Sequence, residues 1–390
     1  MKLKTLSYLI TLILVLGLTD CKAPTEKAFD MQLASQLQAA LENAVENLEA
    51  KFPGVLLYVS SAELGTWTGA AGLGNIETST AMKPDDKFRA GSTLKPFISV
   101  VILQLVEEGR FSLDDPMPAI LPESVTAKFA NSDEITMRML LNHTSGIADF
   151  LIEAVYAEII ANPAKIWKAD EWLDIAGAQE PNFAPGDSWA YCNTEYVLLG
   201  LVIEQATGQS WRQEVRERVI EELNLENTLL PEPGDTSIPI DHARGYHDVG
   251  GELVDFTGVD PSMAGAAGGH ALVTTTADLV QFLDAVLAGE LFQNAETLDE
   301  MLVFVDAPYM GGQVGYGLGM VKYMLPGGVE MLGHSGGTAG YLCLVRHIPV
   351  QGITISMAMT NMESDPTLIL FSVLEMLINE FTPPPPPEKK

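Results

Sequence analysis

The sequence predicts an α+β fold, in which an antiparallel sheet flanked by helices carries a mostly helical inserted subdomain. Strand-like segments occur near the start of the chain and return after residue 250, whereas the segment between them reads as helices joined by proline-containing loops. A sheet assembled from both ends of the chain explains this order. We expect residues 29–112 and 242–381 to form the sheet domain and residues 113–241 to form the helical subdomain, with a cleft between them.

The first elements predicted are a helix, two strands and a second helix. Leucines at helical spacing predict an amphipathic helix over Phe29–Phe52, which Pro53-Gly54 ends. Apolar residues at Val55–Val59 and a glycine-rich segment at Thr66–Ala71 predict strands. The apolar run Phe97–Val106 predicts a buried helix.

The middle of the chain is predicted to be helical and its last third mostly strand. Helices are expected in the middle at Ile135–Leu141, Asp149–Ala161, Ala169–Gly177 and Thr194–Thr207. Strands are expected later at Gly251–Phe256, Gly268–Thr274, Val314–Tyr323, Val329–His334, Ala339–His347 and Gly352–Thr360. Helices are expected among them at Ala277–Ala288, Asn294–Phe304 and Pro366–Phe381, with Thr276 capping the first. The proline-rich tail, residues 382–390, is expected to be extended and exposed.

Composition excludes some functions. The formal net charge of the 390 residues is −30, which argues against nucleic-acid binding, because a basic face is needed to meet phosphate. The same charge disfavours adsorption to anionic lipid. Hydrophobic residues make up 47% of the chain, which is ample for a folded core.

Residues 1–21 predict an export signal, in which two lysines precede the apolar run Leu6–Leu18. That run is too short to span a bilayer comfortably. It is followed by Cys21, as in a bacterial lipoprotein signal, which predicts a periplasmic protein or one anchored to the membrane through a lipid on Cys21. Asp20 departs from that pattern, because a small residue is usual before the lipidated cysteine, and an uncleaved anchor is the alternative.

Cysteine and histidine usage predicts neither a disulfide framework nor a metal site. Cys192 and Cys343 are expected as buried thiols, and a disulfide between them stays open. The six histidines show no His-x-x-x-His or His-x-His spacing. No glycine-rich phosphate loop follows a strand in the right context, so no metal or cofactor is expected.

Ser92 and Lys95 form the only Ser-x-x-Lys of the chain, directly before the apolar run at Phe97. At the start of a helix, residues three apart lie on one face, so the lysine amine can reach the serine hydroxyl. A serine hydroxyl is a weak nucleophile until a base takes its proton. The pair therefore predicts nucleophilic catalysis. The alternative is a structural role, in which the serine caps the helix and the lysine lies on the surface.

A second candidate element is Tyr191-Cys192-Asn193, in a loop before the predicted helix at Thr194. A tyrosine phenol can act as acid or base when its environment favours the required form. The Asn193 amide can hydrogen-bond a substrate amide with both its oxygen and its nitrogen. The alternative is a packing tyrosine and a capping asparagine.

The third candidate is the stretch His334-Ser335-Gly336-Gly337, at the junction of two predicted strands. Glycines there let a ligand approach the strand backbone, and His334 could bind near a substrate carboxylate. With Gly333, the same stretch also fits Gly-x-Ser-x-Gly, the nucleophile elbow of α/β-hydrolases. That alternative needs a helix directly after Ser335, where the sequence instead predicts a strand.

The three motifs occur once each, in this order and widely spaced. In this the sequence resembles the serine β-lactamase and penicillin-binding-protein superfamily, in its class C β-lactamase and D-alanyl-D-alanine carboxypeptidase branch, which includes peptidase family S12 and the β-lactamase-like esterases. The resemblance covers about Phe29 to Phe381. Other stretches that resemble the family are Leu140–Gly146, Phe183–Gly186, Leu198–Gly200, Thr207–Gly208, Gly268–Gly269 and Tyr316–Gly319.

The resemblance implies a β-lactamase/transpeptidase-like fold and a role for each motif. Ser92 would be acylated, and Lys95 and Tyr191 would move its proton to the leaving group. The backbone N–H groups of Ser92 and Gly337 would form the oxyanion hole. Asn193, His334, Ser335 and Gly337 would bind substrate. His334 stands where many relatives have lysine, and this loss of a permanent charge favours a peptidase, amidase or esterase over an efficient β-lactamase.

The function expected is therefore that of an exported serine hydrolase acting through an acyl-enzyme on an amide or ester. The substrate would be a small molecule or a peptidoglycan-derived D-alanyl peptide. The alternative is a penicillin- or peptidoglycan-binding protein without efficient turnover, which the His334 variation and the predicted lipid anchor motivate.

Overall fold

The computed structural model describes residues 27–46, 52–239, 242–325 and 327–381. The predicted signal segment, residues 1–21, and the predicted tail, residues 382–390, lie outside the described residues. Within the described ranges, no helix combines the length and the apolar character that crossing a membrane requires.

Among the described residues, nine strands form one antiparallel sheet in the order β3-β2-β1-β13-β12-β11-β10-β9-β8. The strands are β1 Gly54–Ser61, β2 Gly65–Asn75, β3 Thr80–Ala81, β8 Val305–Tyr309, β9 Gln313–Tyr316, β10 Val321–Met324, β11 Glu330–Thr338, β12 Tyr341–Ile348 and β13 Ile353–Met359. Val55 of β1 pairs with Met359 of β13, so the two ends of the chain meet in the middle of the sheet. The predicted α+β class and the assembly of the sheet from both ends are confirmed.

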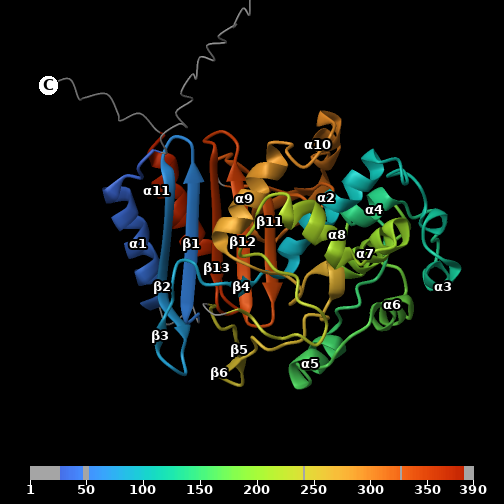
Figure 1. Cartoon of the computed structure of the whole chain (residues 1–390), viewed down its shortest axis with the longest axis horizontal. Helices are drawn as coiled ribbons and strands as arrows, with labels where there is room; N and C mark the ends of the chain where they lie inside the picture. The colour runs from blue at the N-terminus through green and yellow to red at the C-terminus, as the bar shows by residue number, and fades with distance from the viewer. Residues whose placement is uncertain (1–26, 47–51, 240–241, 326, 382–390) are drawn as a thin grey trace, which may run out of the picture.

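Helices cover both faces of this sheet (Figure 1). Helices α1 Met31–Glu46 and α11 Thr367–Asn379 pack side by side on one face, where Leu33, Leu37 and Leu41 are buried. Helices α2 Leu94–Glu107 and α9 Thr276–Leu287 cover the other face. The rings of Phe97 and Phe282 stack there with centroids 3.6 Å apart, joining these two helices.

The remaining helices gather on the side of the sheet away from α1 (Figure 1). They are α3 Glu123–Thr126, α4 Met137–Asn142, α5 Glu153–Ala161, α6 Ala169–Gly177, α7 Asn193–Thr207, α8 Trp211–Val215 and α10 Ala295–Met301. A π-helix over Arg216–Glu221 follows α8 directly. The division into domains at residues 113 and 241 stays a prediction.

Two small two-stranded sheets are separate from the large one. Strand β4 Phe88–Arg89 pairs with β7 Val273–Thr274, and β5 Tyr246–Val249 pairs with β6 Glu252–Asp255. The strands predicted near Glu252 and Val273 therefore exist but do not join the main sheet.

Some element predictions were wrong in detail. The single strand predicted over Val314–Tyr323 is a hairpin, because Gly317-Leu318-Gly319 turns the chain between β9 and β10. Gly319 has a φ of +79°, which favours glycine, and a Cβ on it would lie 2.0 Å from the Ser99 hydroxyl. The cap of α9 is Thr275 rather than Thr276, since the Thr275 hydroxyl accepts a hydrogen bond from the Asp278 N–H.

Strand β11 lies directly against the turn that carries Ser92. That turn is a 3₁₀ helix over Gly91–Thr93, in which Gly91 has a φ of +54°. A Cβ on Gly91 would lie 2.7 Å from the Gly337 carbonyl oxygen, and one on Gly336 would lie 1.9 Å from the Ala90 carbonyl oxygen. Only glycine permits this approach, so the glycines of β11 fix the strand beside the turn.

Replacing Gly336 should therefore destabilise the protein. We expect Gly336→Ala to lower the free energy of unfolding by about 1–3 kcal/mol, because the added methyl group would collide with backbone. Gly258→Ala is the matched control, since no atom lies within 4 Å of a Cβ built at that position. Urea unfolding of the two variants measures the difference, and equal stabilities would show that β11 does not depend on this approach.

Candidate active site

Ser92 and Lys95 meet where the 3₁₀ turn enters α2. The Lys95 amine donates to the Ser92 hydroxyl at 3.1 Å, to the Asn193 side-chain oxygen at 2.9 Å and to the Ala267 carbonyl at 2.6 Å. Lys95 has no exposed surface, whereas Ser92 remains half-buried. The nucleophile candidate is thus reachable from solvent while its candidate base is not.

Burial gives the Lys95 amine the character of a base. Desolvation lowers the pKa of Lys95 to about 7, and the nearby Asp149 carboxylate opposes this shift. A lysine with its ordinary pKa near 10.4 would be protonated at neutral pH and could not accept a proton. With a pKa near 7, a large share of the amine is neutral and has a lone pair to offer the Ser92 hydroxyl.

Tyr191 lies beside the same amine, at the entry to α7. The Lys95 amine is 4.8 Å from the centre of the Tyr191 ring. Burial raises the pKa of the Tyr191 phenol well above its usual range, and a hydrogen bond with Ser92 counters that rise only in part. The phenol is therefore protonated at neutral pH, which suits a proton donor or relay better than a base.

Asn193 begins α7 and joins two charged side chains. Its side-chain oxygen accepts from Lys95, and its side-chain nitrogen donates to an Asp149 carboxylate oxygen at 2.8 Å. The Asn193 side chain keeps one N–H and one oxygen lone pair without a partner in these two bonds, so it can still form the predicted hydrogen bonds to a substrate amide.

His334 lies on β11 and is held as a neutral imidazole. Its Nδ1 lies 2.6 Å from the Ser335 carbonyl oxygen, which can only accept, so we assign the proton to Nδ1. The Tyr316 hydroxyl then donates to His334 Nε2 at 2.9 Å. Burial lowers the pKa of His334 to about 3, and the charge of Lys95 acts in the same direction.

Ser335 and Gly337 lie on the same strand. The Ser335 hydroxyl accepts from the buried Arg346 guanidinium at 2.6 Å, and that guanidinium stacks 3.7 Å from the Tyr323 ring centre. Gly337 is exposed and lies against the Ser92 turn. Because Ser335 lies within a strand and not at a strand-to-helix turn, the nucleophile-elbow alternative is wrong.

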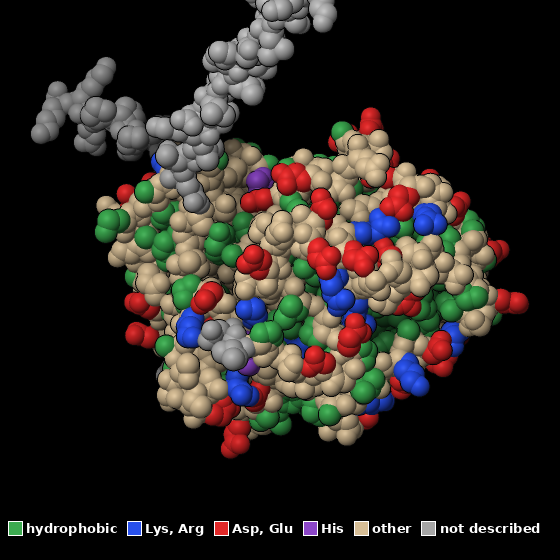
Figure 2. All heavy atoms as spheres, viewed as in Figure 1, with side chains coloured by type: hydrophobic (Ala, Val, Ile, Leu, Met, Phe, Trp, Pro, Cys, Tyr) green, Lys and Arg blue, Asp and Glu red, His purple; other side chains and the backbone are tan. Residues whose placement is uncertain are grey.

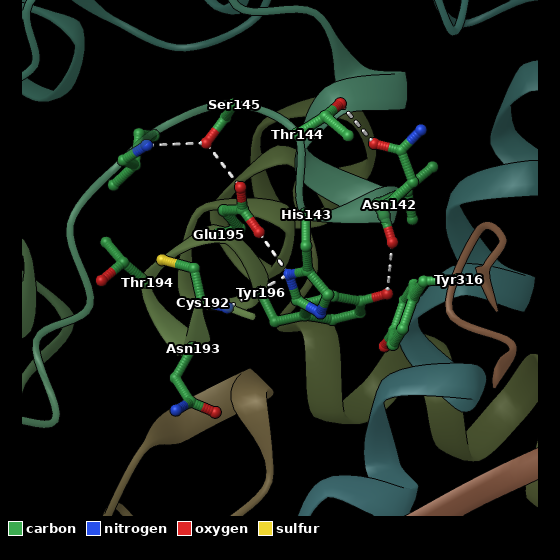
Figure 3. Close-up of polar contacts among 12 residues, drawn as sticks. Asn142, His143, Thr144, Ser145, Cys192, Asn193, Thr194, Glu195, Tyr196 and Tyr316 are labelled. Atoms are coloured by element: carbon green, nitrogen blue, oxygen red, sulfur yellow. Dashed lines mark hydrogen bonds and ion pairs between the residues drawn. The ribbon is translucent and has the colours of Figure 1, made fainter. Parts of the chain in front are cut away.

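A buried polar network joins His143, Ser145, Cys192 and Glu195 (Figure 3). His143 Nδ1 contacts a Glu195 carboxyl oxygen, and the Ser145 hydroxyl donates to the other oxygen. The Cys192 N–H also donates to His143 Nδ1, at 3.4 Å. The His143 ring packs against the rings of Tyr191 and Tyr316, each with centroids 4.5 Å apart.

This network is best described as neutral. In a neutral pair the proton lies on Glu195, whose carboxyl then donates to the lone pair of His143 Nδ1. Burial lowers the pKa of His143 well below its usual range and raises that of Glu195 well above it, in the direction that a neutral pair requires. His143 Nε2 finds no hydrogen-bond partner among the described residues.

The three predicted motifs thus converge on Ser92. Their residues come from three regions that are far apart in sequence: the 3₁₀ turn with the start of α2, the loop before α7 with its first residue, and β11. The sequence did not single out Asp149, Glu195, Tyr316 or Arg346 as parts of this site. Cys192 and Cys343 are both buried, and within the described part of the chain they form no disulfide.

Comparison with known proteins decides the family. A family model described as Beta-lactamase matches residues 36–370. The chain belongs to the Beta-lactamase family. The family resemblance read from the sequence is thereby confirmed.

Two solved structures and one curated relative illustrate what this Beta-lactamase family chain is similar to. A D-stereospecific amidohydrolase from Streptomyces sp. has 33% sequence identity and a TM-score of 0.78, covering 88% of this chain and 97% of that one. The D-amino acid amidase from Ochrobactrum anthropi SV3, complexed with L-phenylalanine amide, has 26% identity and a TM-score of 0.77, covering 90% and 100%. Penicillin-binding protein 4 of Amycolatopsis lactamdurans is 27% identical over 302 residues, which is 74% of this chain and 76% of that protein.

These findings make the chain a serine hydrolase of the Beta-lactamase family. The roles of its individual side chains follow from the geometry above and are proposals.

Because the His143–Glu195 pair is neutral, two substitutions of Glu195 should differ sharply in their effect on the free energy of unfolding. Glu195→Gln should leave the free energy of unfolding nearly unchanged, because glutamine also donates to His143 Nδ1 and accepts from Ser145. Glu195→Ala should cost about 3 kcal/mol, because it leaves both partners buried without that bond. Urea unfolding measures both variants. Equal losses would mean that Glu195 carries a charge in the folded protein.

Proposed function

We propose that this hydrolase cleaves amides or esters through an acyl-enzyme formed on Ser92. The observation that carries the proposal is the 3.1 Å contact between the Ser92 hydroxyl and a fully buried lysine amine whose pKa is about 7. A hydroxyl beside a neutral amine can be deprotonated as it attacks, which is what a serine nucleophile requires.

In the first half-reaction, neutral Lys95 takes the Ser92 proton while the serine oxygen bonds to the substrate carbonyl carbon. The backbone N–H groups of Ser92 and Gly337 would stabilise the oxyanion that forms. The proton then passes to the leaving nitrogen or oxygen, with the Tyr191 phenol as relay, and the carbonyl–leaving-group bond breaks. In the second half, neutral Lys95 takes a proton from water as the water oxygen bonds to the acyl carbon, and the bond between that carbon and the Ser92 oxygen breaks. The proton returns to the Ser92 oxygen and the carboxylic acid leaves.

An amide or simple ester fits this site better than a substrate that must present a carboxylate to residue 334. His334 is neutral at physiological pH, and its Nε2 is already engaged by the Tyr316 hydroxyl. It therefore offers no cation at the position where a permanent charge would hold a carboxylate. The similar amidohydrolase and amidase structures also support an amidase.

Export and lipid anchoring belong to the same proposal. The two lysines and apolar run of residues 1–18, followed by Cys21, support secretion to the periplasm with a lipid on Cys21. A hydrolase at that location would meet peptidoglycan-derived peptides as well as small amides.

Covalent labelling tests the nucleophile. A fluorophosphonate should modify one peptide, and mass spectrometry should place the adduct on Ser92. Ser92→Ala should abolish labelling while leaving the unfolding midpoint close to that of the natural chain. An adduct on another serine, or full labelling of the Ser92→Ala variant, would refute the proposal. Labelling followed by no turnover of any ester or amide would instead favour a binding protein.

The pH dependence tests the base. We expect kcat/KM for a neutral ester to fall about tenfold per pH unit below about pH 7, because Lys95 must be neutral to accept the proton. The titratable groups that face Lys95 are Asp149, Tyr191, Cys192, Glu195, Tyr196, His143 and His334. His334 should not contribute to this limb, since its pKa is about 3. A profile that stays flat from pH 5 to pH 9 would contradict Lys95 as the base.

A further inference from the structure

Tyr196 lies one helical turn after Asn193, and both side chains reach the Lys95 amine. The Asn193 oxygen accepts from that amine at 2.9 Å, and the amine lies over the Tyr196 ring, 5.4 Å from its centre. Residues three apart on a helix share a face, so the start of α7 presents an amide and an aromatic ring to the same nitrogen. The Tyr191 ring is 4.8 Å away. Among the described residues, these two rings lie beside the amine that the proposed reaction uses as its base.

The three acceptors that the Lys95 nitrogen contacts are uncharged. They are the Ser92 hydroxyl, the Asn193 amide oxygen and the Ala267 carbonyl. Burial penalises the ammonium form and lowers the pKa of Lys95 to about 7. The face of an aromatic ring is electrostatically negative, and it attracts a cation more strongly where water is excluded. The two ring faces therefore favour the ammonium form and oppose the effect of burial.

The Tyr196 hydroxyl has partners of its own. It donates to the Leu141 carbonyl at 2.9 Å, and the Ser99 hydroxyl lies 3.1 Å from it. The side chain is fully buried, and burial raises the pKa of its phenol, so the phenol keeps its proton. Tyr191 differs, because its hydroxyl is the proposed proton relay, and a change to its ring would also change that relay. At Tyr196 the effect of a ring face on Lys95 can be measured by itself.

We infer that Tyr196 is a positioning residue of the reaction, whose ring face stabilises the ammonium form that Lys95 takes while it holds the Ser92 proton. The inference rests on the proposed acyl-enzyme function and adds a residue to it. Without the attraction of this ring, Lys95 would be a weaker base, neutral at lower pH but less able to take the serine proton. The ring thus raises the pH at which the neutral base becomes available.

Other charges act on the same amine. Among the described residues, the further titratable groups that face Lys95 are Asp149, Tyr191, Cys192, Glu195, His143 and His334. The net charge is −30, and Figure 2 shows acidic side chains spread over the visible face. That surface charge also favours the ammonium form, but salt screens it. Fluorination of the ring at position 196 changes none of these groups, so it isolates the contribution of the ring.

The test places fluorinated rings at position 196 of the full chain. Fluorine withdraws electrons from the ring face, so two fluorine atoms weaken its attraction for a cation and five reverse it. Tyr196→Phe is the reference, and difluorophenylalanine or pentafluorophenylalanine then replaces Tyr196. NMR of lysine labelled with ¹³C at the ε-carbon follows the titration of Lys95, and kcat/KM for p-nitrophenyl acetate follows the acidic limb. Sodium chloride at about 0.5 M screens the surface charge.

Both midpoints should fall together along the series, by about one pH unit between the phenylalanine and the pentafluorophenylalanine variants. Because the difluoro ring is close in size to that of phenylalanine, that variant should fold even where the pentafluoro variant does not, with about half the shift. Pentafluorophenylalanine in place of Phe282 is the matched control. The Phe282 ring is also buried, but it stacks on Phe97, with centroids 3.6 Å apart. This control should move neither midpoint.

A Lys95 midpoint that stays the same along the series would overturn the inference, as would an equal fall in the Phe282 control. A purely structural disturbance at position 196 would lower kcat/KM at every pH and leave the midpoint in place, which would also count against it. If the natural chain fails to hydrolyse p-nitrophenyl acetate, the proposed function fails. The NMR titration still measures the effect of the ring on Lys95, so the two failures are distinguishable.

Discussion

The active site depends on the burial of one amine, that of Lys95. Lys95 has no exposed surface, yet its nitrogen must be able to lose and regain a proton beside Ser92. Desolvation alone would make the charged form costly, and three hydrogen-bond acceptors with a nearby carboxylate compensate in part. The balance of these opposing effects brings the pKa of Lys95 to about 7. The nucleophile is therefore activated by its surroundings and not by the type of side chain alone.

The fold supplies each part of that environment from a different region. The apolar helix α2 places Lys95 in the core one turn after Ser92. Helix α7 begins at Asn193 and brings Tyr191 to the amine, while the neutral His143–Glu195 pair packs behind the phenol. Strand β11 closes the site because its glycines allow backbone contact with the Ser92 turn. A sheet built from both ends of the chain is what brings β11 to a helix about 240 residues earlier.

Sequence reasoning predicted the features that depend on local pattern. Helix α6 matches its predicted bounds, and the apolar strand β1 was found because buried segments read as continuous apolar runs. The edge strand β8 was missed, since it contains Asp306 and Pro308 and resembles a loop. Likewise, Ser92, Lys95, Tyr191 and His334 stand in recognisable motifs. Asp149 does not, because only folding brings it to Asn193, 44 residues away.

Activation of Ser92 requires a lysine amine that is neutral at physiological pH, and NMR of lysine labelled with ¹³C at the ε-carbon observes that amine directly. One lysine signal should titrate near pH 7, as the burial of Lys95 requires, and it should be missing from the spectrum of Lys95→Met. If the signal lost in Lys95→Met instead stays charged above pH 9, Lys95 is not a neutral base at physiological pH.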